Sequence, residues 1–323
     1  MIKPYSCLII GLGQVGLTYD LNVNNKNVFL SHAKSIHFHK NFSLDAAVEI
    51  NKEKIKIFTK VYKTKAFSSV KEAATYKNYS VIIISVPTEH HYKIFQDILK
   101  YCKPKLILCE KPISYKLKEV EFILKNCKKS KIDFFVNYIR RADPACIKIK
   151  SKIQSMITRS LPLKGICWYN KGLLHSGLHY LDLCSFWLGS IKKITRANKI
   201  QKINYYDYSL DFIADFEGGQ VTFLSWENNS FSMFSLEILT SDGRIRYDHE
   251  GNLAYLNPIK NNIFVENYLE LNQKKIIFKS NMNQCQFNLL NEISNFLENK
   301  SYNLSSGETD SKVLKSLSKI IEN

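Results

Sequence analysis

The chain has 323 residues, of which 45% are hydrophobic and 23% are charged, a composition typical of soluble globular proteins and long enough for two domains. No run of about 18 apolar residues occurs, and the apolar stretch at the N-terminus is too short for a signal peptide. We therefore expect no contact with a membrane and a cytoplasmic location. The net charge of +17 rests almost entirely on dispersed lysines, whereas proteins that recognise DNA or RNA concentrate arginine, so we expect no nucleic-acid partner.

The eight cysteines form no C-x-x-C pair, and several lie inside apolar segments. Free cysteine in such segments behaves as a small hydrophobic residue. We therefore expect neither a zinc cluster nor a disulfide framework.

Short apolar runs alternate with amphipathic segments over the first 140 residues. Strands are predicted at 6–11, 44–50, 79–87, 104–112 and 131–139, and helices between them include 90–102 and 116–129. Strands that alternate with helices indicate right-handed βαβ units and a parallel sheet. Residues 1–140 are therefore expected to form a doubly wound, dinucleotide-binding Rossmann domain.

The first predicted strand runs directly into "GLGQVG", which places Gly11, Gly13 and Gly16 in a G-x-G-x-x-G pattern. Glycines at this spacing permit a tight turn, a close approach of the backbone to a pyrophosphate, and packing of a helix on the sheet. The intervening Leu12, Gln14 and Val15 are expected to line the same phosphate site. The alternative interpretation is a tight turn without a ligand.

Glu49 ends the second predicted strand, where an acidic residue would bond the ribose hydroxyls of NAD and repel the 2′-phosphate of NADP. Lys52 and Lys54 stand nearby and leave NADP as the alternative cofactor. The spacing from the glycines is longer than usual, because a polar insertion at 17–30 would have to loop out.

Polar residues also follow two further strands, at the edge where doubly wound sheets bind ligands. After the strand at 79–87 we expect cofactor contacts from Ser85, Pro87, Thr88 and His91, although a proline-ended strand with a threonine helix cap explains the pattern equally well. After the strand at 104–112, Glu110 and Lys111 are candidates for the cofactor site; a solvated strand end is the alternative.

The pattern changes after residue 140. A helix at 143–156 is followed by alternating strands, with hairpins predicted at 208–226, turning at Gly218-Gly219, and at 235–249, turning at Asp242-Gly243. Two helical segments end the chain. We expect residues 141–323 to form a substrate-binding and oligomerisation domain, α+β with a large, mostly antiparallel open sheet, whose last helix packs back on the first domain.

Between these elements, "KGLLHSGLHYLDL" places His175, His179 and Asp182 at i, i+4 and i+7, on one face if the segment is helical. The spacing allows a metal site, acid–base chemistry or a satisfied polar helix face. The segment lacks the glutamate of H-E-x-x-H metal sites, and a bound dinucleotide would supply the electrophile, so no metal is expected.

Three motifs in one order, "GLGQVG", "CEKP" and "HSGLHYLD", together with "VNYIRRADP" at 136–144, resemble the Gfo/Idh/MocA family of NAD(P)-dependent sugar and polyol dehydrogenases. The resemblance implies that Lys111 lies near the nicotinamide, that the Lys111–Pro112 peptide is often cis, and that His179 is the general base. It also implies an assembly, homodimer or homotetramer, through the C-terminal sheet. Candidate substrate contacts are Tyr138, Arg140, Arg141, His175 and Asp182, with Asp182 mainly orienting His179.

One residue departs from the family pattern D-x-G-x-H-x-x-D, because His175 occupies the position of the leading aspartate. Some members that resemble surface-glycan (polysaccharide) biosynthesis enzymes vary here. We therefore expect hydride transfer to or from a secondary hydroxyl or ketone of a sugar or nucleotide sugar. The alternative is a catalytically silent dinucleotide-binding regulator or sensor.

Overall fold

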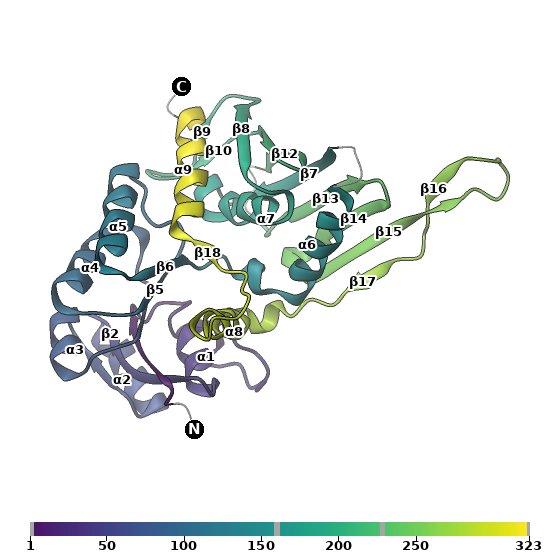
Figure 1. Ribbon diagram of the computed structural model, residues 1–323. Helices are drawn as coiled ribbons and strands as arrows, with labels where there is room; N and C mark the ends of the chain where they lie inside the picture. Colours follow the sequence, from purple (N-terminus) through teal and green to yellow (C-terminus); the bar gives the residue numbers. More distant parts are fainter. Residues whose placement is uncertain (1–2, 158–161, 227–229, 322–323) are drawn as a thin grey trace. The chain divides into compact units, whose positions relative to one another are not determined.

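The computed structural model describes residues 3–157, 162–226 and 230–321 (Figure 1). The chain divides into two compact units, Met1–Ala142 with Asn283–Ser311, and Asp143–Met282 with Lys312–Asn323. The predicted division, with its single boundary at residue 140, differs from these units because residues 283–311 return to the first one.

The first unit is built around a sheet of six parallel strands with a short antiparallel strand at one edge. Its strands are β1 (Tyr5–Ile10), β2 (Phe42–Val48), β3 (Lys65–Phe67), β4 (Val81–Ile84), β5 (Leu106–Cys109), β6 (Asp133–Val136) and β18 (Ser305–Ser306). The spatial order is β18-β6-β5-β4-β1-β2-β3, and only β18 runs antiparallel to its neighbour. This is the doubly wound order: strands β2 and β3 are added on one side of β1, and β4 to β6 on the other. The switch between β1 and β4 leaves a crevice for a ligand. The predicted Rossmann architecture is confirmed.

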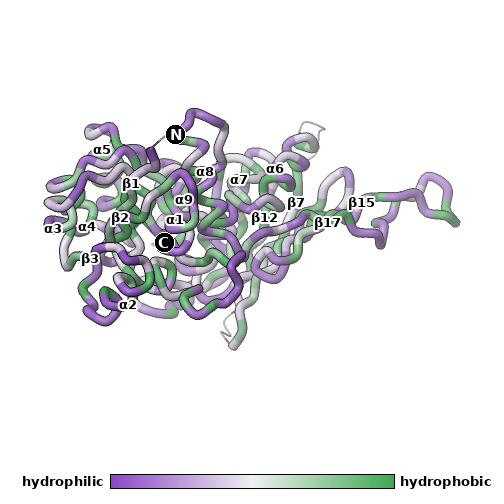
Figure 2. Tube along the Cα trace, turned by 90° about the horizontal axis from the view of Figure 1, so that it is seen from below, coloured by the Kyte–Doolittle hydropathy of each residue, from purple (hydrophilic) through white to green (hydrophobic). Residues whose placement is uncertain are grey.

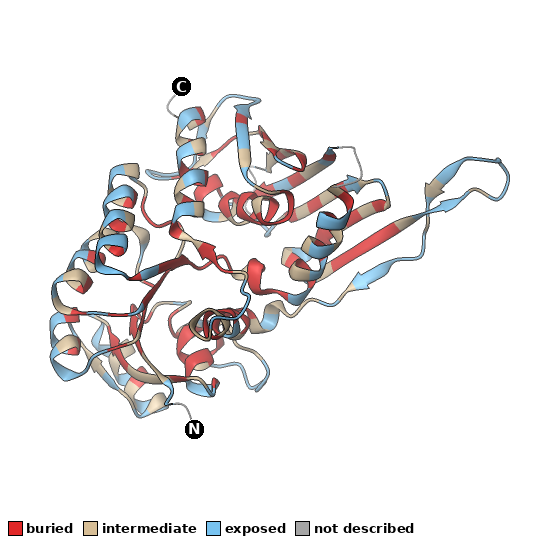
Figure 3. Ribbon diagram, viewed as in Figure 1, coloured by how far each residue is buried: buried red, intermediate tan, exposed pale blue. Residues whose placement is uncertain are grey.

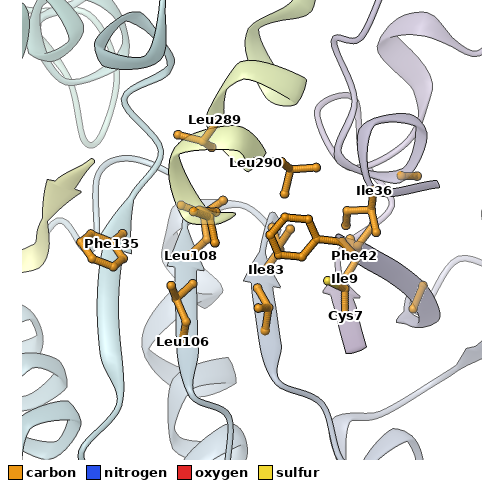
Figure 4. Close-up of a cluster of buried hydrophobic side chains, with 14 of the residues drawn as sticks. Cys7, Ile9, Ile36, Phe42, Ile83, Leu106, Leu108, Phe135, Leu289 and Leu290 are labelled. Atoms are coloured by element: carbon orange, nitrogen blue, oxygen red, sulfur yellow. The ribbon is translucent and has the colours of Figure 1, made fainter. Parts of the chain in front are cut away.

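The helices of the first unit are α1 (His32–Phe38), α2 (Lys52–Tyr62), α3 (Val70–Tyr76), α4 (Thr88–Tyr101), α5 (Leu117–Ser130), α8 (Cys285–Leu297) and the start of α9 (Gly307–Ile321). Helix α8 belongs here because Leu289, Leu290 and Ile293 join the apolar core formed by strand residues such as Ile83 and Leu108 (Figure 4). Burial of these side chains supplies the main stabilisation of the unit.

The second unit holds a large sheet with the order β16-β15-β14-β13-β7-β12-β11-β8, and β17 also pairs with β15. Its elements are α6 (Pro144–Ile157), β7 (Leu163–Asn170), α7 (Leu178–Leu188), β8 (Ile191–Arg196), β9 (Gln201–Lys202), β10 (Tyr208–Ser209), β11 (Phe212–Phe216), β12 (Gly219–Trp226), β13 (Phe234–Thr240), β14 (Gly243–Asp248), β15 (Leu253–Asn261), β16 (Leu269–Leu271) and β17 (Ile276–Phe278). Within this sheet only β7 and β12 pair in parallel, so the predicted mostly antiparallel sheet is confirmed.

Buried and half-exposed residues alternate along strands such as β14, as expected of a sheet with one covered face (Figure 3). Beyond the sheet, the end of β15 and β16 continue as a two-stranded hairpin (Figure 1). The tip of this hairpin exposes Ile263, Phe264 and Val265. Figure 2 shows the hydropathy along the chain, with hydrophobic residues at the far end of the hairpin beyond β15.

Both predicted hairpins form, but each turn lies one residue earlier than predicted. Phe216 pairs with Gly219 and Thr240 pairs with Gly243, so the second residue of each predicted turn is already in a strand. A Cβ on Gly219 would lie 2.4 Å from the Leu163 carbonyl oxygen, and one on Gly243 would lie 2.0 Å from that of Asn257. These glycines are therefore required by the close approach of a neighbouring strand.

Candidate functional site

The glycine loop follows β1 at the point where the order of the sheet reverses. Gly11 has φ +100°, and a Cβ there would lie 2.7 Å from the backbone of Ser85. A Cβ on Gly16 would lie 2.1 Å from the Gly11 carbonyl oxygen, whereas the space around Gly13 is open to 4 Å. The outer two glycines thus allow the turn and the packing, and the middle one leaves room beside the backbone. This arrangement fits a dinucleotide pyrophosphate.

The helix that should follow the glycine loop is interrupted and then resumed. A first turn forms when the Leu17 N–H donates to the Gly13 oxygen over 2.9 Å. Thr18–Asp20 continues as a 3-10 turn, and residues 21–31 then leave the helix. Helix α1 takes up the next carbonyls, since the His32 N–H donates to Val15 over 2.9 Å and the Ala33 N–H donates to Gly16 over 3.1 Å. The predicted insertion therefore loops out without moving the phosphate-binding turn.

Asp20 closes the insertion at its base. Its buried carboxylate accepts from the Leu30 N–H at 2.7 Å, from the Ser31 N–H at 3.0 Å and from the Ser31 hydroxyl at 2.5 Å. Because these bonds tie both ends of the loop together, α1 starts at a fixed position beside the first helical turn.

Glu49 follows β2 and faces the glycine loop. One carboxylate oxygen accepts the Leu12 N–H over 2.7 Å, and the other accepts the N–H groups of Ile50 and Asn51, each over 2.9 Å. The carboxylate is therefore held at the edge of the loop. An acidic group at this place suits the ribose hydroxyls of NAD.

The residues after β4 lie differently from the prediction. The Ser85 hydroxyl is buried and donates to the Gly11 carbonyl over 2.8 Å, so it supports the glycine loop from behind. His91 is also buried, with Nε2 2.9 Å from the Val86 oxygen and Nδ1 3.1 Å from the Pro112 oxygen. It therefore joins two loops and does not face a cofactor ribose as we expected. Pro87 is the N-cap of α4 and Thr88 is its first residue.

Burial lowers the pKa of His91, although hydrogen bonds to the carbonyls of Val86 and Ile113 act in the opposite direction. The ring is thus stabilised in its neutral form.

Glu110 and Lys111 form the corner after β5, and the Lys111–Pro112 peptide is cis. The Glu110 carboxylate contacts His32 Nε2 at 3.0 Å and Asn137 Nδ2 at 2.5 Å. Burial alone would raise the pKa of Glu110, but the His32 and Asn137 hydrogen bonds and the charge of Lys111 lower it below its ordinary value. The corner therefore carries a carboxylate directly before the lysine.

The three residues predicted as substrate contacts near 140 are buried within the first unit. Tyr138 is 2% exposed and its hydroxyl donates to the Asp310 carboxylate. Arg140 and Arg141 are 6% and 8% exposed. All three side chains are therefore buried, and their contact with a substrate stays a prediction.

In the second unit, the segment with the two histidines begins as a π-helical turn, Leu173–Gly177, before α7. The wider turn displaces the strict 3.6-residue spacing, and the three side chains differ in exposure: His175 is exposed, His179 is half-buried and Asp182 is 1% exposed. The three residues therefore do not share one exposed face, and the burial of Asp182 argues against its direct contact with a substrate.

Asp207 fixes the start of this segment. Its carboxylate accepts the Leu174 N–H over 2.7 Å and the His175 N–H over 2.9 Å, and it fills the space where a Cβ on Gly172 would lie 2.2 Å away. A carboxylate at a helix N-terminus satisfies unpaired N–H groups and interacts favourably with the helix dipole.

Sequence reasoning missed His32, Asn137, Gln286 and Asp207. Ser31 ahead of α1 and Asn204 before Asp207 are capping signals, but no local pattern indicates which distant group these side chains reach. Among the described residues, no group of three or more metal-ligating side chains is arranged to hold an ion, and no helix is long and apolar enough to cross a membrane.

Solved structures with the same fold cover nearly the whole chain. An oxidoreductase from Agrobacterium radiobacter, in complex with NAD+, L-tartaric acid and magnesium, is 14% identical, with 99% of this chain and 96% of that chain covered and a TM-score of 0.76. A putative myo-inositol dehydrogenase from Sinorhizobium meliloti 1021 is 17% identical, with 98% of each chain covered and a TM-score of 0.70. A UDP-N-acetylglucosamine 3-dehydrogenase from Acidithiobacillus ferrooxidans is 14% identical, with 99% and 97% covered and a TM-score of 0.72.

At these identities the solved structures establish the fold alone, and no curated protein matches the sequence. The family model described as the oxidoreductase family with an NAD-binding Rossmann fold matches residues 5–138. Residues 5–138 therefore belong to the Gfo/Idh/MocA oxidoreductase family as its NAD-binding Rossmann domain.

Proposed function

We propose that the protein transfers a hydride between NAD and a secondary hydroxyl or ketone of a sugar or nucleotide sugar. The observation that carries this proposal is the start of α7. Two imidazoles, the exposed His175 and the half-buried His179, stand at the beginning of a helix whose following residues are mostly buried. Titratable groups held at the end of a rigid element are suited to proton transfer.

In this proposal His179 accepts the hydroxyl proton of the substrate while the carbon–hydrogen bond breaks. Lys111 stabilises the negative charge that develops on the oxygen. Bound NAD supplies the acceptor for the hydride, and ketone reduction follows the same steps in reverse. Neutral histidine near pH 7 suits the role of the base.

His175 defines the substrate in this proposal. An imidazole in place of the family's aspartate can donate or accept a hydrogen bond with a sugar hydroxyl, and it carries no negative charge near neutral pH. The net charge of +17 would also favour encounter with an anionic, diphosphate-linked sugar. The names of the UDP-N-acetylglucosamine 3-dehydrogenase and of the putative myo-inositol dehydrogenase support the same substrate class.

The test follows the near-ultraviolet absorbance of reduced nicotinamide. The purified protein is mixed with NAD+ and, separately, with UDP-N-acetylglucosamine, other nucleotide sugars, myo-inositol and L-tartrate. Reduction of NAD+ by a sugar or nucleotide sugar supports the proposal, and reduction by L-tartrate alone would replace its substrate class. If NADH binds but no compound changes its redox state in either direction, the protein is a dinucleotide-binding sensor and the proposal is wrong.

The proposal includes assembly into a homodimer or homotetramer through the half-exposed face of the second sheet. This face carries charged side chains such as Glu237 and Arg246, which pair at 2.9 Å. A molar mass of one chain in analytical ultracentrifugation at micromolar concentration would refute this part.

A further inference from the structure

A connected set of polar side chains lies inside the first unit, next to the Glu110–Lys111 corner. His32 Nε2 lies 3.0 Å from Glu110 Oε1, and Asn137 Nδ2 lies 2.5 Å from the same oxygen. The Asn137 amide also donates to Gln286 Oε1 over 3.1 Å. His32, Asn137 and Gln286 are 0%, 1% and 2% exposed. His32 begins α1, Asn137 follows β6 and Gln286 lies in α8, so two distant segments reach the carboxylate directly and the third reaches it through Asn137.

The directions of these hydrogen bonds follow from the chemistry of Glu110. An ionised carboxylate only accepts, so the proton of the His32 ring must be on Nε2 and the amide nitrogen of Asn137 must face Glu110. The Asn137 amide nitrogen then satisfies both of its neighbours, Glu110 and Gln286. The orientation of the whole set is therefore determined by one negative charge.

Two acceptors in this set have no hydrogen-bond partner among the described residues, His32 Nδ1 and Asn137 Oδ1. The partners that hold the two side chains are therefore on their other side, where His32 Nε2 and Asn137 Nδ2 contact Glu110.

His32 is also part of the phosphate-binding turn. Its backbone N–H donates to the Val15 oxygen over 2.9 Å, while its side chain reaches the Glu110 carboxylate. The insertion separates His32 from Val15 in sequence, yet α1 begins where the His32 N–H can still reach the Val15 carbonyl. One residue thus connects the glycine loop with the corner that carries Lys111.

We propose that His32 is a positioning residue, which anchors Glu110 through Nε2 and thereby sets the charge and placement of the Lys111 ammonium relative to the glycine loop. The importance of Lys111 for turnover rests on the function proposed above. The structural part of the inference, that His32 acts on Lys111 through Glu110, is independent of that function.

The first test needs no substrate. Trace acetic anhydride labels each lysine in proportion to its free amine, and peptide mass spectrometry after labelling over a range of pH values reports Lys111 separately. Removal of the adjacent opposite charge in Glu110→Gln should make the Lys111 amine easier to deprotonate and raise its labelling at neutral pH about tenfold. In His32→Ala the carboxylate loses a charge-assisted partner and becomes more easily protonated. The labelling of Lys111 at neutral pH should therefore rise about threefold. His32→Gln, which keeps a donor, should stay near the wild type.

His39 provides the matched control. It is the C-cap of α1 and 5% exposed, and its Nε2 lies 3.0 Å from the neutral amide oxygen of Asn291. His39→Ala should lower the melting temperature as His32→Ala does but leave the labelling of Lys111 unchanged. Equal labelling of Lys111 in the wild type, His32→Ala and Glu110→Gln would overturn the inference. Equal changes in His32→Ala and His39→Ala would reduce it to a general effect of a loosened helix.

The second test applies once a compound is turned over. His32→Ala should lower kcat up to about 100-fold, because misplacement of a reacting group has effects of this size. The affinity for NADH, measured by nicotinamide fluorescence, should stay within about threefold, since the glycine loop itself is unaltered. If no compound is turned over, the function fails, while the labelling still decides the role of His32. A loss of NADH affinity that accounts for the whole fall in kcat/KM would contradict positioning.

Discussion

The glycine loop of the first unit and the histidine segment of the second unit position functional groups in different ways. The glycine loop works through backbone: Gly11 and Gly16 leave no room for a Cβ, and Glu49 and Ser85 fix the surrounding N–H and carbonyl groups. The histidine segment works through side chains, which a π-helical turn and the Asp207 carboxylate hold in place. In the proposed function, backbone geometry selects the cofactor and side-chain identity decides the chemistry, so substitutions should separate the two.

The largest expected effect comes from His179→Ala. Loss of a general base lowers kcat by a factor of about 10² to 10⁴, and NADH should bind as before because the glycine loop is untouched. Stopped assays with the most active compound and fluorescence titration of NADH measure the two quantities. An unchanged kcat would remove His179 from the role of base.

The glycine loop can be broken at two positions with opposite expected results. Gly16→Ala places a Cβ 2.1 Å from the Gly11 oxygen and should cost about 1–3 kcal/mol of unfolding free energy through overpacking. Gly13→Ala enters open space and should leave the unfolding free energy nearly unchanged while weakening NADH about tenfold or more, since the pyrophosphate approaches there. Urea unfolding and NADH titration of both variants test this, and similar results for the two would contradict the separate roles of the glycines.

Asp207→Asn tests whether the histidine segment depends on its cap. The amide keeps an acceptor oxygen but loses the charge, so the unfolding free energy should fall by about 0.5–2 kcal/mol. Turnover should fall as His175 and His179 lose their fixed placement, with NADH affinity unchanged. Asp211→Asn is the control, because its carboxylate accepts from the N–H and hydroxyl of Ser225 and not from the N–H groups of the histidine segment. Equal losses of turnover in both variants would show that Asp207 has no special relation to the segment.

The smallest effect concerns pH. Burial lowers the pKa of both His91 and His39 in the folded state, so below about pH 6.5 the unfolded chain binds more protons than the folded one. The unfolding free energy should therefore decrease as the pH falls from 6.5. The contribution of the two histidines should become constant once the pH is below their pKa values in the folded state. His91→Gln should reduce this dependence, as measured by urea unfolding at several pH values. A greater stability at pH 5.5 than at pH 7 would contradict the sign.

Much of the fold could be predicted because periodicity and glycine spacing are local signals. The strands ending at Ile10, Ile84 and Cys109 and the loop at Gly11–Gly16 were read from a few neighbouring residues each. The hairpin turns differ from the prediction because Gly219 and Gly243 are required inside strands, where each packs closely against a neighbouring strand that the local sequence does not identify. His91, Tyr138 and Asp182 are predicted at the site but are buried in the structure. Only tertiary contacts decide whether a polar residue near a strand end or on a helix is buried, and the local sequence does not show these contacts.

The contacts of His32 were unpredictable on the same grounds. Residues 16–31 separate it from Val15, whose carbonyl its N–H reaches, and its side-chain partner Glu110 lies 78 positions further along the chain. No local pattern carries such a pairing.

The central claim, the proposed hydride transfer that depends on Lys111, is tested most directly by comparing the wild type with Lys111→Met in the nicotinamide absorbance assay over nucleotide sugars and polyols. The account predicts that at least one sugar or nucleotide sugar reduces NAD+ with the wild type, and that Lys111→Met binds NADH but reduces NAD+ at least about 100 times more slowly. Equal rates for the two proteins, or no redox change with any compound in either direction, would contradict it.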